Sequence, residues 1–138
     1  MSNDKQDEAS MRKEQLKQVV QTYFHALSKR NFSAIPYDEN IILRAPLVPG
    51  GVNNPLYGKE LVKAQWWEPL EPALQGVRIN ILDYYINETL TGIITEAEIT
   101  LANPGVTLRV ADRFTIDSDG KIQQQENHFD ASSLQNPG

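Results

Sequence analysis

The chain contains no cysteine, which excludes disulfides, thiolate metal sites and cysteine nucleophiles. Histidine is scarce too: His25 and His128 are the only two, and neither has carboxylates at the spacing of a metal-ligand set. The motifs GxGxxG, GxxxxGK[ST] and GxSxG are missing, which argues against nucleotide-binding loops and nucleophile elbows. We therefore expect neither a metal ion nor a cofactor.

Long hydrophobic runs and basic clusters are also missing. No apolar run approaches the ~18 residues of a membrane span, and the first ten residues, MSNDKQDEAS, lack the apolar core of a signal peptide. Lysine and arginine occur at most in pairs, and the formal net charge is −5, so the sequence lacks the basic surface that nucleic acids require. We expect a cytoplasmic protein without a membrane or nucleic-acid partner.

The length of 138 residues corresponds to one domain with a single core. Residues 1–10 are polar and without periodicity, which predicts a disordered tail, followed by one domain over 11–131 and a flexible tail over 132–138. A stripe of apolar residues at spacings of three and four predicts an amphipathic helix over 11–28.

The rest of the chain is rich in strands. After a strand at 40–44, three prolines and three glycines mark a long loop over 45–58. A helix is expected from 59 until Pro69 disrupts it, and long strands follow at 77–87, 92–101, 106–117 and 121–130. Helices first and antiparallel strands afterwards predict an α+β domain in which one curved sheet packs on the helices.

One carboxylate is out of place in this pattern. In LRVADRFTID, residues 108–117, the period of two puts Asp112 on the same face as Val110 and Phe114. A carboxylate on an apolar face must find a partner, reach water or take up a proton. A salt-bridged or solvent-exposed structural acid is one interpretation, and a functional acid is the other.

The order of elements, with VVQTYFHALSKRNFSAI at the front and VADRFTIDSDGKIQQQENHFD at the back, resembles the nuclear transport factor 2-like superfamily. This group has a cystatin-like fold and includes ketosteroid isomerases, limonene epoxide hydrolases and SnoaL-like polyketide cyclases. The resemblance implies a cone-shaped domain enclosing one apolar pocket. It also implies a homodimer paired through the outer face of the sheet.

The resemblance to ketosteroid isomerases implies roles for two residues. A tyrosine on the first long helix and a protonated aspartic acid on a late strand form an oxyanion hole in those enzymes. These positions match Tyr23 and Asp112. The isomerase base is an aspartate before a proline, where this chain has Ala45 before Pro46. The proton-transfer base is therefore missing from its usual place.

The other enzymes of the superfamily match less well. The Asp-Arg-Asp set of the epoxide hydrolases falls on Ile99, Ala97 and Asn127, which argues against activation of water by that route. SnoaL-like cyclases are expected to use an aspartate near the last strand, where this chain offers Asn127 and, further along, Asp130. An asparagine can hydrogen-bond a substrate but cannot take its proton.

Three functions remain open. The first is a binding protein for a small apolar ligand with one oxygen function, held by Tyr23 and Asp112. The second is an isomerase or cyclase acting through an enolate, with a base such as Asp38, Glu39 or Glu68. The third is a structural dimer without a ligand. The residues expected to line the pocket are Ala45, Trp66, Val110, Phe114, Asn127 and Phe129. Of the adjacent Trp66 and Trp67, one is expected in the core and the other on the surface or at an interface.

Overall fold

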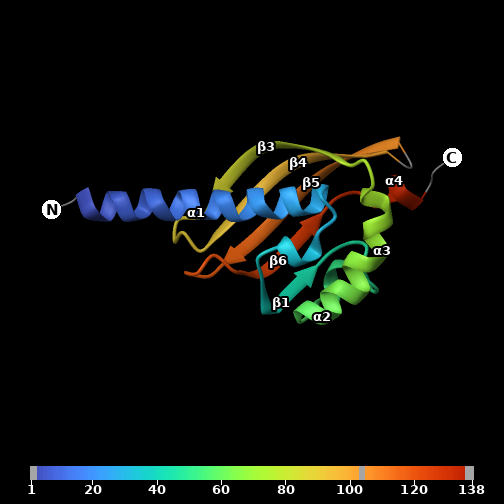
Figure 1. The fold of residues 1–138 in the computed structure, drawn as a ribbon, viewed down its shortest axis with the longest axis horizontal. Helices are drawn as coiled ribbons and strands as arrows, with labels where there is room; N and C mark the ends of the chain where they lie inside the picture. The colour runs from blue at the N-terminus through green and yellow to red at the C-terminus, as the bar shows by residue number, and fades with distance from the viewer. Residues whose placement is uncertain (1–2, 103–104, 136–138) are drawn as a thin grey trace.

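A long helix, a six-stranded sheet and a short helical segment form one α+β unit in the computed structural model, which describes residues 3–102 and 105–135. The helix α1 covers one face of the curved sheet, and α2 and α3 close one end of it (Figure 1). The helical bounds are α1 Asn3–Ser28, η1 Phe32–Ala34, η2 Gly51–Asn53, α2 Lys59–Val62, η3 Lys63–Trp67, α3 Glu68–Leu70, η4 Glu71–Leu74 and α4 Ser132–Gln135.

The sheet has the strand order β2-β1-β6-β5-β4-β3, so the first and last long strands are neighbours at its centre. Only β1 and β6 run parallel, and every other pair is antiparallel. This arrangement confirms the predicted fold class. The strand bounds are β1 Tyr37–Arg44, β2 Leu56–Tyr57, β3 Arg78–Ile86, β4 Gly92–Ala102, β5 Gly105–Ile116 and β6 Ile122–His128.

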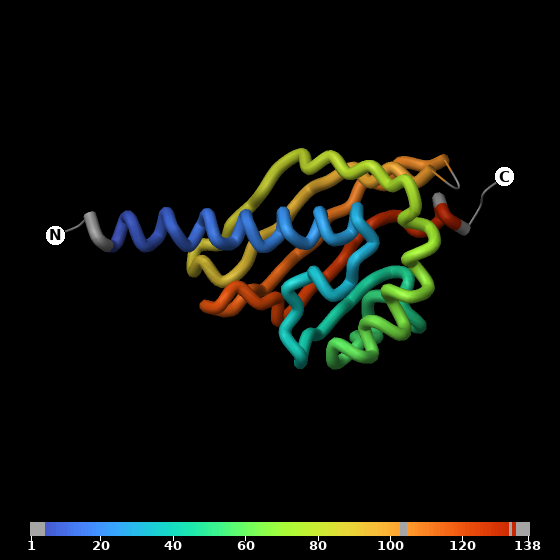
Figure 2. Tube along the Cα trace, viewed as in Figure 1, coloured from blue at the N-terminus to red at the C-terminus, as the bar shows by residue number. Residues whose placement is uncertain are grey.

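The predicted faces of β5 agree with the structure. Val110, Asp112 and Phe114 are buried, whereas Arg109 and Arg113 alternate with them on the exposed face. The inner face packs against the apolar stripe of α1, which places the core between helix and sheet. The trace in Figure 2 shows α1 running along this inner face.

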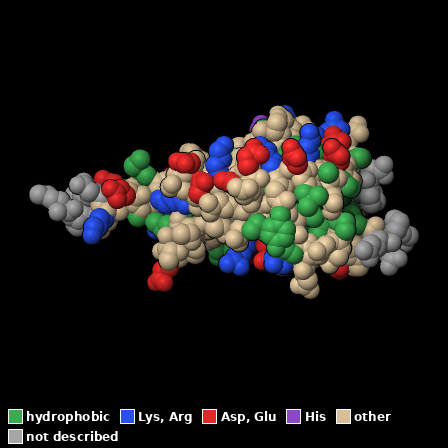
Figure 3. Space-filling model, turned by 90° about the horizontal axis from the view of Figure 1, so that it is seen from below, with side chains coloured by type: hydrophobic (Ala, Val, Ile, Leu, Met, Phe, Trp, Pro, Cys, Tyr) green, Lys and Arg blue, Asp and Glu red, His purple; other side chains and the backbone are tan. Residues whose placement is uncertain are grey.

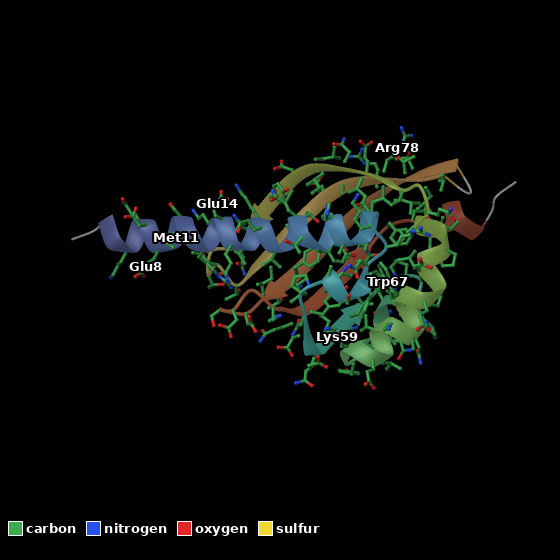
Figure 4. All side chains as sticks on the ribbon, in the orientation of Figure 1. Glu8, Met11, Glu14, Lys59, Trp67 and Arg78 are labelled. Carbon is green, nitrogen blue, oxygen red and sulfur yellow. The ribbon has the colours of Figure 1, made fainter. Side chains whose placement is uncertain are left out.

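The helix α1 begins earlier than the sequence predicted. Residues 3–10 were expected in a disordered tail, but they form the first turns of α1, and 1–2 lie outside the described residues. Lys, Gln, Glu and Ala are good helix formers, so the turn at Met11 extends backwards without needing an apolar stripe. Glu8 and Met11 lie on the part of α1 that extends beyond the sheet (Figure 4).

Arg12 fixes this long helix to the turns at the end of the sheet. Its guanidinium donates hydrogen bonds to the backbone oxygens of Leu90 at 2.9 Å, Ile116 at 2.7 Å and Asp117 at 2.9 Å. One side chain therefore joins α1 to the β3–β4 and β5–β6 turns. In the latter turn Gly120 has a φ of +82°, which a glycine adopts without strain.

The helical segment after the long loop continues past Pro69, where the sequence predicted that it would be disrupted. Its winding widens to a π-helix over η3, directly before Pro69, and then resumes as α3 and η4. A proline removes one backbone donor and crowds the carbonyl four residues earlier, and a π-bulge accommodates such a defect.

Both tryptophans of this segment are buried, so the prediction of one core and one surface tryptophan is wrong. Trp66 and Trp67 are each 4% exposed, and their ring centroids are 6.2 Å apart. Trp67 packs on Phe32 with a centroid distance of 5.5 Å, while Trp66 faces a cavity. The segment packs on Phe32 on one side and borders the cavity on the other, so each indole is buried in a different place.

The C-terminal prediction also needs correction. A flexible tail was expected over 132–138, but Ser132–Gln135 form α4, and 136–138 lie outside the described residues. The side chain of Asp130 accepts hydrogen bonds from the backbone amide and the hydroxyl of Ser132, which stabilises the first turn. Within 3–102 and 105–135, no helix is long and apolar enough to cross a membrane.

Candidate functional site

A cavity of about 350 Å³ lies between α1, the α2–η4 segment and the inner face of the sheet. Its wall is mostly apolar, with Leu27 from the helix, Trp66 from η3 and Val110 from β5 among the lining side chains. Among the lining residues, Tyr23, Trp66 and Asn127 are the ones whose side chains carry a polar group. The cavity thus presents an apolar volume with a small polar area.

A chain of buried side-chain hydrogen bonds lies behind the polar area. Tyr37 donates its hydroxyl hydrogen to the side-chain oxygen of Gln125. The Nε2 of Gln125 then donates to the hydroxyl oxygen of Tyr23 at 2.9 Å and to Oδ1 of Asp112 at 3.3 Å. The Nδ2 of Asn127 donates to the same carboxylate oxygen at 2.6 Å. These contacts connect α1, β1, β5 and β6 through polar groups in an apolar surrounding.

Asp112 is the carboxylate that the sequence pattern singled out, and it is 1% exposed. Burial raises its pKa from the ordinary value of 3.8 to about 6, against the lowering effect of the hydrogen bonds from Asn127 and Gln125. No ion pair of Asp112 occurs among the described residues, so neither a salt bridge nor exposure to solvent explains this acid. Its partners are two amides.

The two tyrosines of the network also respond to burial. Desolvation raises the pKa of Tyr23 well above its usual value, and the nearby charge of Asp112 raises it further. The same two causes raise the pKa of Tyr37. Both phenols therefore stay protonated over the physiological range and act as hydrogen-bond donors. Tyr23 also contacts Phe24 and Phe114 edge to face, with centroid distances of 5.0 and 5.1 Å, which fixes its ring.

The structure separates the predicted site residues into two groups. Five of them line the cavity: Tyr23, Trp66, Val110, Asn127 and Phe129. Three others, Ala45, Phe114 and Asp112, are buried behind the wall instead of on it. Ala45 and Phe114 are each fully buried, and the ring of Phe114 contacts that of Tyr23 edge to face.

The candidate bases do not lie at the cavity. Asp38 accepts a hydrogen bond from the backbone of Asn40, the side chain of Glu39 is 82% exposed, and Glu68 is exposed. None of the three lines the cavity wall, so the prediction that one of them is the base is wrong. Arg44 does not line the cavity either, and its Nη1 donates a hydrogen bond to the backbone oxygen of Val52 at 2.9 Å.

Sequence reasoning missed the central member of the network. Gln125 is 1% exposed and contacts Tyr37, Tyr23 and Asp112, although the pattern indicated only that it shares a face with Asn127. Its position in β6 directly beside β5 is a consequence of strand order, which the sequence pattern does not encode. The described residues contain no group of three or more acidic or histidine side chains that could hold a metal ion.

Comparisons with known proteins identify the family and agree with the fold. The sequence family described as SnoaL-like domain matches residues 20–125. No curated protein matches the sequence. A crystal structure of a nuclear transport factor 2-like protein from Cytophaga hutchinsonii is similar, with 17% identity, a TM-score of 0.65 and coverage of 88% of this chain and 95% of the other.

Two further structures have named activities or ligands. A steroid delta-isomerase from Pseudomonas aeruginosa has 17% identity and a TM-score of 0.63, covering 88% of this chain and 84% of the other. The protein RV0760c from Mycobacterium tuberculosis, in complex with estradiol-17beta-hemisuccinate, has 12% identity and a TM-score of 0.68, covering 86% and 95%. At these identities the similarity shows the fold alone. Because the family match covers most of its length, the chain belongs to the SnoaL-like domain family.

Proposed function

We propose that this protein binds a small, largely apolar molecule carrying one oxygen function, with the oxygen placed against Tyr23 and Asn127 and supported by Asp112. The observation that carries the proposal is a mostly apolar cavity lined by Tyr23 and Asn127, whose side chains are connected behind the wall through Gln125 and Asp112. Cavities of this size and composition, with a few convergent polar groups, are typical of small-molecule sites. The steroid ester held by the similar mycobacterial protein supports an apolar ligand class.

The role of Asp112 in this proposal differs from that of a direct donor to the ligand. Tyr23 lines the cavity, and Asp112 lies behind Asn127 and accepts its amide hydrogen. We therefore assign the direct contact with the ligand oxygen to Tyr23 and Asn127. Asp112 contributes by holding the amides in place.

The test is a titration with phenols of graded acidity, which mimic an oxygen that carries partial negative charge. We expect affinity to rise with the acidity of the phenol, because the hydroxyl of Tyr23 stabilises developing charge on the ligand oxygen. The variant Tyr23→Phe keeps the ring and removes the donor, so this dependence should flatten. Absence of binding to any phenol would contradict the proposal.

A matched pair of substitutions tests whether the phenols bind in this cavity. Ala73 lines the cavity from η4 and is half-buried, so Ala73→Trp should fill the cavity and abolish binding of every phenol. Ala64 is exposed on the same helical segment and does not line the cavity. Ala64→Trp should bind as the wild type does, and equal effects of both substitutions would place the site elsewhere.

A second candidate function is enolisation of a bound ketone, as in an isomerase or cyclase. The observation that favours it is the pKa of Asp112 of about 6, a value suited to proton transfer near neutral pH. No carboxylate lines the cavity among the described residues, and this candidate function uses Asp112, which lies behind the wall, as the proton-transfer group. Deuterium exchange at the α-carbon of 2-tetralone, followed by NMR, measures this step. Exchange no faster than in buffer, or unchanged in Asp112→Asn, would leave binding as the function.

A further inference from the structure

The directions of the hydrogen bonds in the buried network restrict what the cavity wall presents to a ligand. Tyr37 has one hydrogen, and it is donated to the oxygen of Gln125. The nitrogen end of Gln125 must then face Tyr23 and Asp112. An ionised carboxylate only accepts hydrogen bonds, so it imposes the same orientation on the amide of Asn127.

The consequence for Tyr23 concerns its hydroxyl hydrogen. The hydroxyl oxygen already accepts a hydrogen bond from Gln125 at 2.9 Å. The hydrogen is then free to act as a donor, and Tyr23 lines the cavity. The wall therefore offers a donor at this point, in an orientation fixed from behind by Gln125 and Tyr37.

The consequence for Asn127 concerns its carbonyl oxygen. Its nitrogen donates to Asp112 at 2.6 Å, and the carbonyl oxygen accepts no hydrogen bond within 3–102 and 105–135. This oxygen is not among the fully enclosed atoms without a partner, and Asn127 lines the cavity. The wall therefore offers an acceptor as well as the donor of Tyr23, and the two residues are connected behind it through Gln125 and Asp112.

The geometry points to a ligand that carries a hydroxyl group, which accepts from Tyr23 and donates to the carbonyl of Asn127, with Asp112 as the positioning residue that fixes this pair. A ketone satisfies Tyr23 but leaves the carbonyl of Asn127 without a donor, and an unpaired polar group in an apolar cavity disfavours binding. This inference rests on the proposed function and narrows it to alcohols, phenols and enols.

The experiment compares four naphthalenes of similar shape by calorimetric titration: 2-naphthol, 2-methylnaphthalene, 2-methoxynaphthalene and 2-ethylnaphthalene. 2-Naphthol is matched in size to 2-methylnaphthalene, and 2-methoxynaphthalene is matched to 2-ethylnaphthalene. For each pair, the preference for the oxygen compound is the ratio of the two Kd values. The cost of transferring each compound from water is the same for every variant, so it cancels when these ratios are compared between variants. The first pair reports a group that both donates and accepts, and the second pair reports an acceptor alone.

Two variants at the wall separate the donor from the acceptor. We expect Tyr23→Phe to reduce the preference for the oxygen compound in both pairs, because both oxygens accept from the phenol. Asn127→Leu should reduce the preference for 2-naphthol by about tenfold, the worth of one net hydrogen bond, and leave that for 2-methoxynaphthalene unchanged. An equal loss in both pairs with Asn127→Leu would overturn the inference.

Two variants at Asp112 test its positioning role. Asp112→Asn still presents an oxygen to the amides of Asn127 and Gln125, so it should retain the preference for 2-naphthol. Asp112→Leu presents none, and the preference should fall to the level of Asn127→Leu while 2-methylnaphthalene still binds. Loss of preference in Asp112→Asn as well would contradict the positioning role. If no naphthalene binds the wild type, the proposed function itself fails, whereas binding without a preference for the hydroxyl overturns this inference alone.

Discussion

Thr95 on β4 lies directly opposite Asp112 on β5, and each of them has one fully buried oxygen without a hydrogen-bond partner among the described residues. The two atoms are Oγ1 of Thr95 and Oδ2 of Asp112. Side chains directly opposite on antiparallel strands have Cβ atoms about 4.5–5.5 Å apart, so a hydroxyl and a carboxylate in this relationship reach each other directly or through one water.

Replacement of Thr95 by valine tests whether this pair is made. We expect the hydroxyl to donate to Oδ2 of Asp112, since buried polar atoms are rarely left without a partner. Thr95→Val should then lower the free energy of unfolding by about 1–2 kcal/mol at pH 7.5, measured in urea. Thr95→Ser keeps the hydroxyl and should lose less. Equal stability of Thr95→Val and the wild type would show that the hydroxyl is not bound to Asp112.

The two tryptophans allow the cavity to be probed without a label, because Trp66 and Trp67 are the only ones in the chain. Trp66 lines the cavity and Trp67 packs on Phe32 outside it. A brominated alcohol such as 6-bromohexanol quenches indole fluorescence only near contact. We expect it to quench the fluorescence of Trp66 in the variant Trp67→Phe. The fluorescence of Trp67 in Trp66→Phe should be nearly unaffected. The reverse pattern would place the ligand on the Phe32 side.

The sequence pattern predicted the fold and part of the site for a physical reason. The period of two in β5 depends only on which residues tolerate burial, so the inward direction of Asp112 was readable from residues 108–117. The same holds for Tyr23 on the apolar stripe of α1. The partners of Asp112 were not readable, because Gln125, Asn127 and Thr95 meet it through strand order and register.

Local rules gave the wrong result where packing outweighed them. Pro69 predicts the disruption of a helix, but the π-helix of η3 accommodates it. Adjacent tryptophans predict one buried and one exposed side chain, but η3 is covered on two sides and both are buried. The start of α1 was predicted at Met11, where the stripe begins, although helix propensity alone carries it back to Asn3.

Arg12 should contribute to stability without affecting the cavity. It donates to three backbone oxygens of two turns at the end of the sheet, far along α1 from Tyr23. Hydrogen bonds from a charged donor are stronger than those between neutral groups, so Arg12→Met should lower the free energy of unfolding by about 2 kcal/mol. Urea unfolding measures this, and phenol affinity in the same variant should stay at the wild-type value. A loss of affinity would show that the turns are coupled to the cavity.

The outer face of the sheet is the surface expected to pair two copies of the chain. Register places Tyr85, Ile94 and Arg113 in one row across β3, β4 and β5, and Tyr85 and Ile94 are exposed. Elsewhere on the surface, charges of both signs are scattered over the face shown in Figure 3, where hydrophobic side chains gather toward the end away from the start of α1. We expect a dimer in sedimentation equilibrium at micromolar concentration, and Ile94→Arg should shift it toward monomer. A wild-type protein that sediments as a monomer would exclude this pairing.

The charge on Asp112 should make the stability of this protein fall as the pH rises through a defined window. Its pKa in the folded state is raised to about 6, above the ordinary value of 3.8 that applies to the unfolded chain. Between these two values the folded state binds a proton that the unfolded state does not, so the free energy of unfolding decreases as pH rises and levels off above pH 6. The decrease amounts to about 3 kcal/mol for this single group.

Comparison with Asp112→Asn isolates this contribution, because other acids titrate equally in both proteins. We expect the variant to gain stability relative to the wild type by about 2.5 kcal/mol between pH 4 and pH 8, measured by urea unfolding. Tyr23, Tyr37 and His128 are the titratable groups that act on Asp112, and both tyrosines stay protonated here. His128 acts through its charge, so the comparison is repeated with His128→Gln in both proteins. A difference between wild type and Asp112→Asn that stays constant with pH would mean that Asp112 keeps its ordinary pKa, and that the two amides favour its charge as strongly as burial disfavours it.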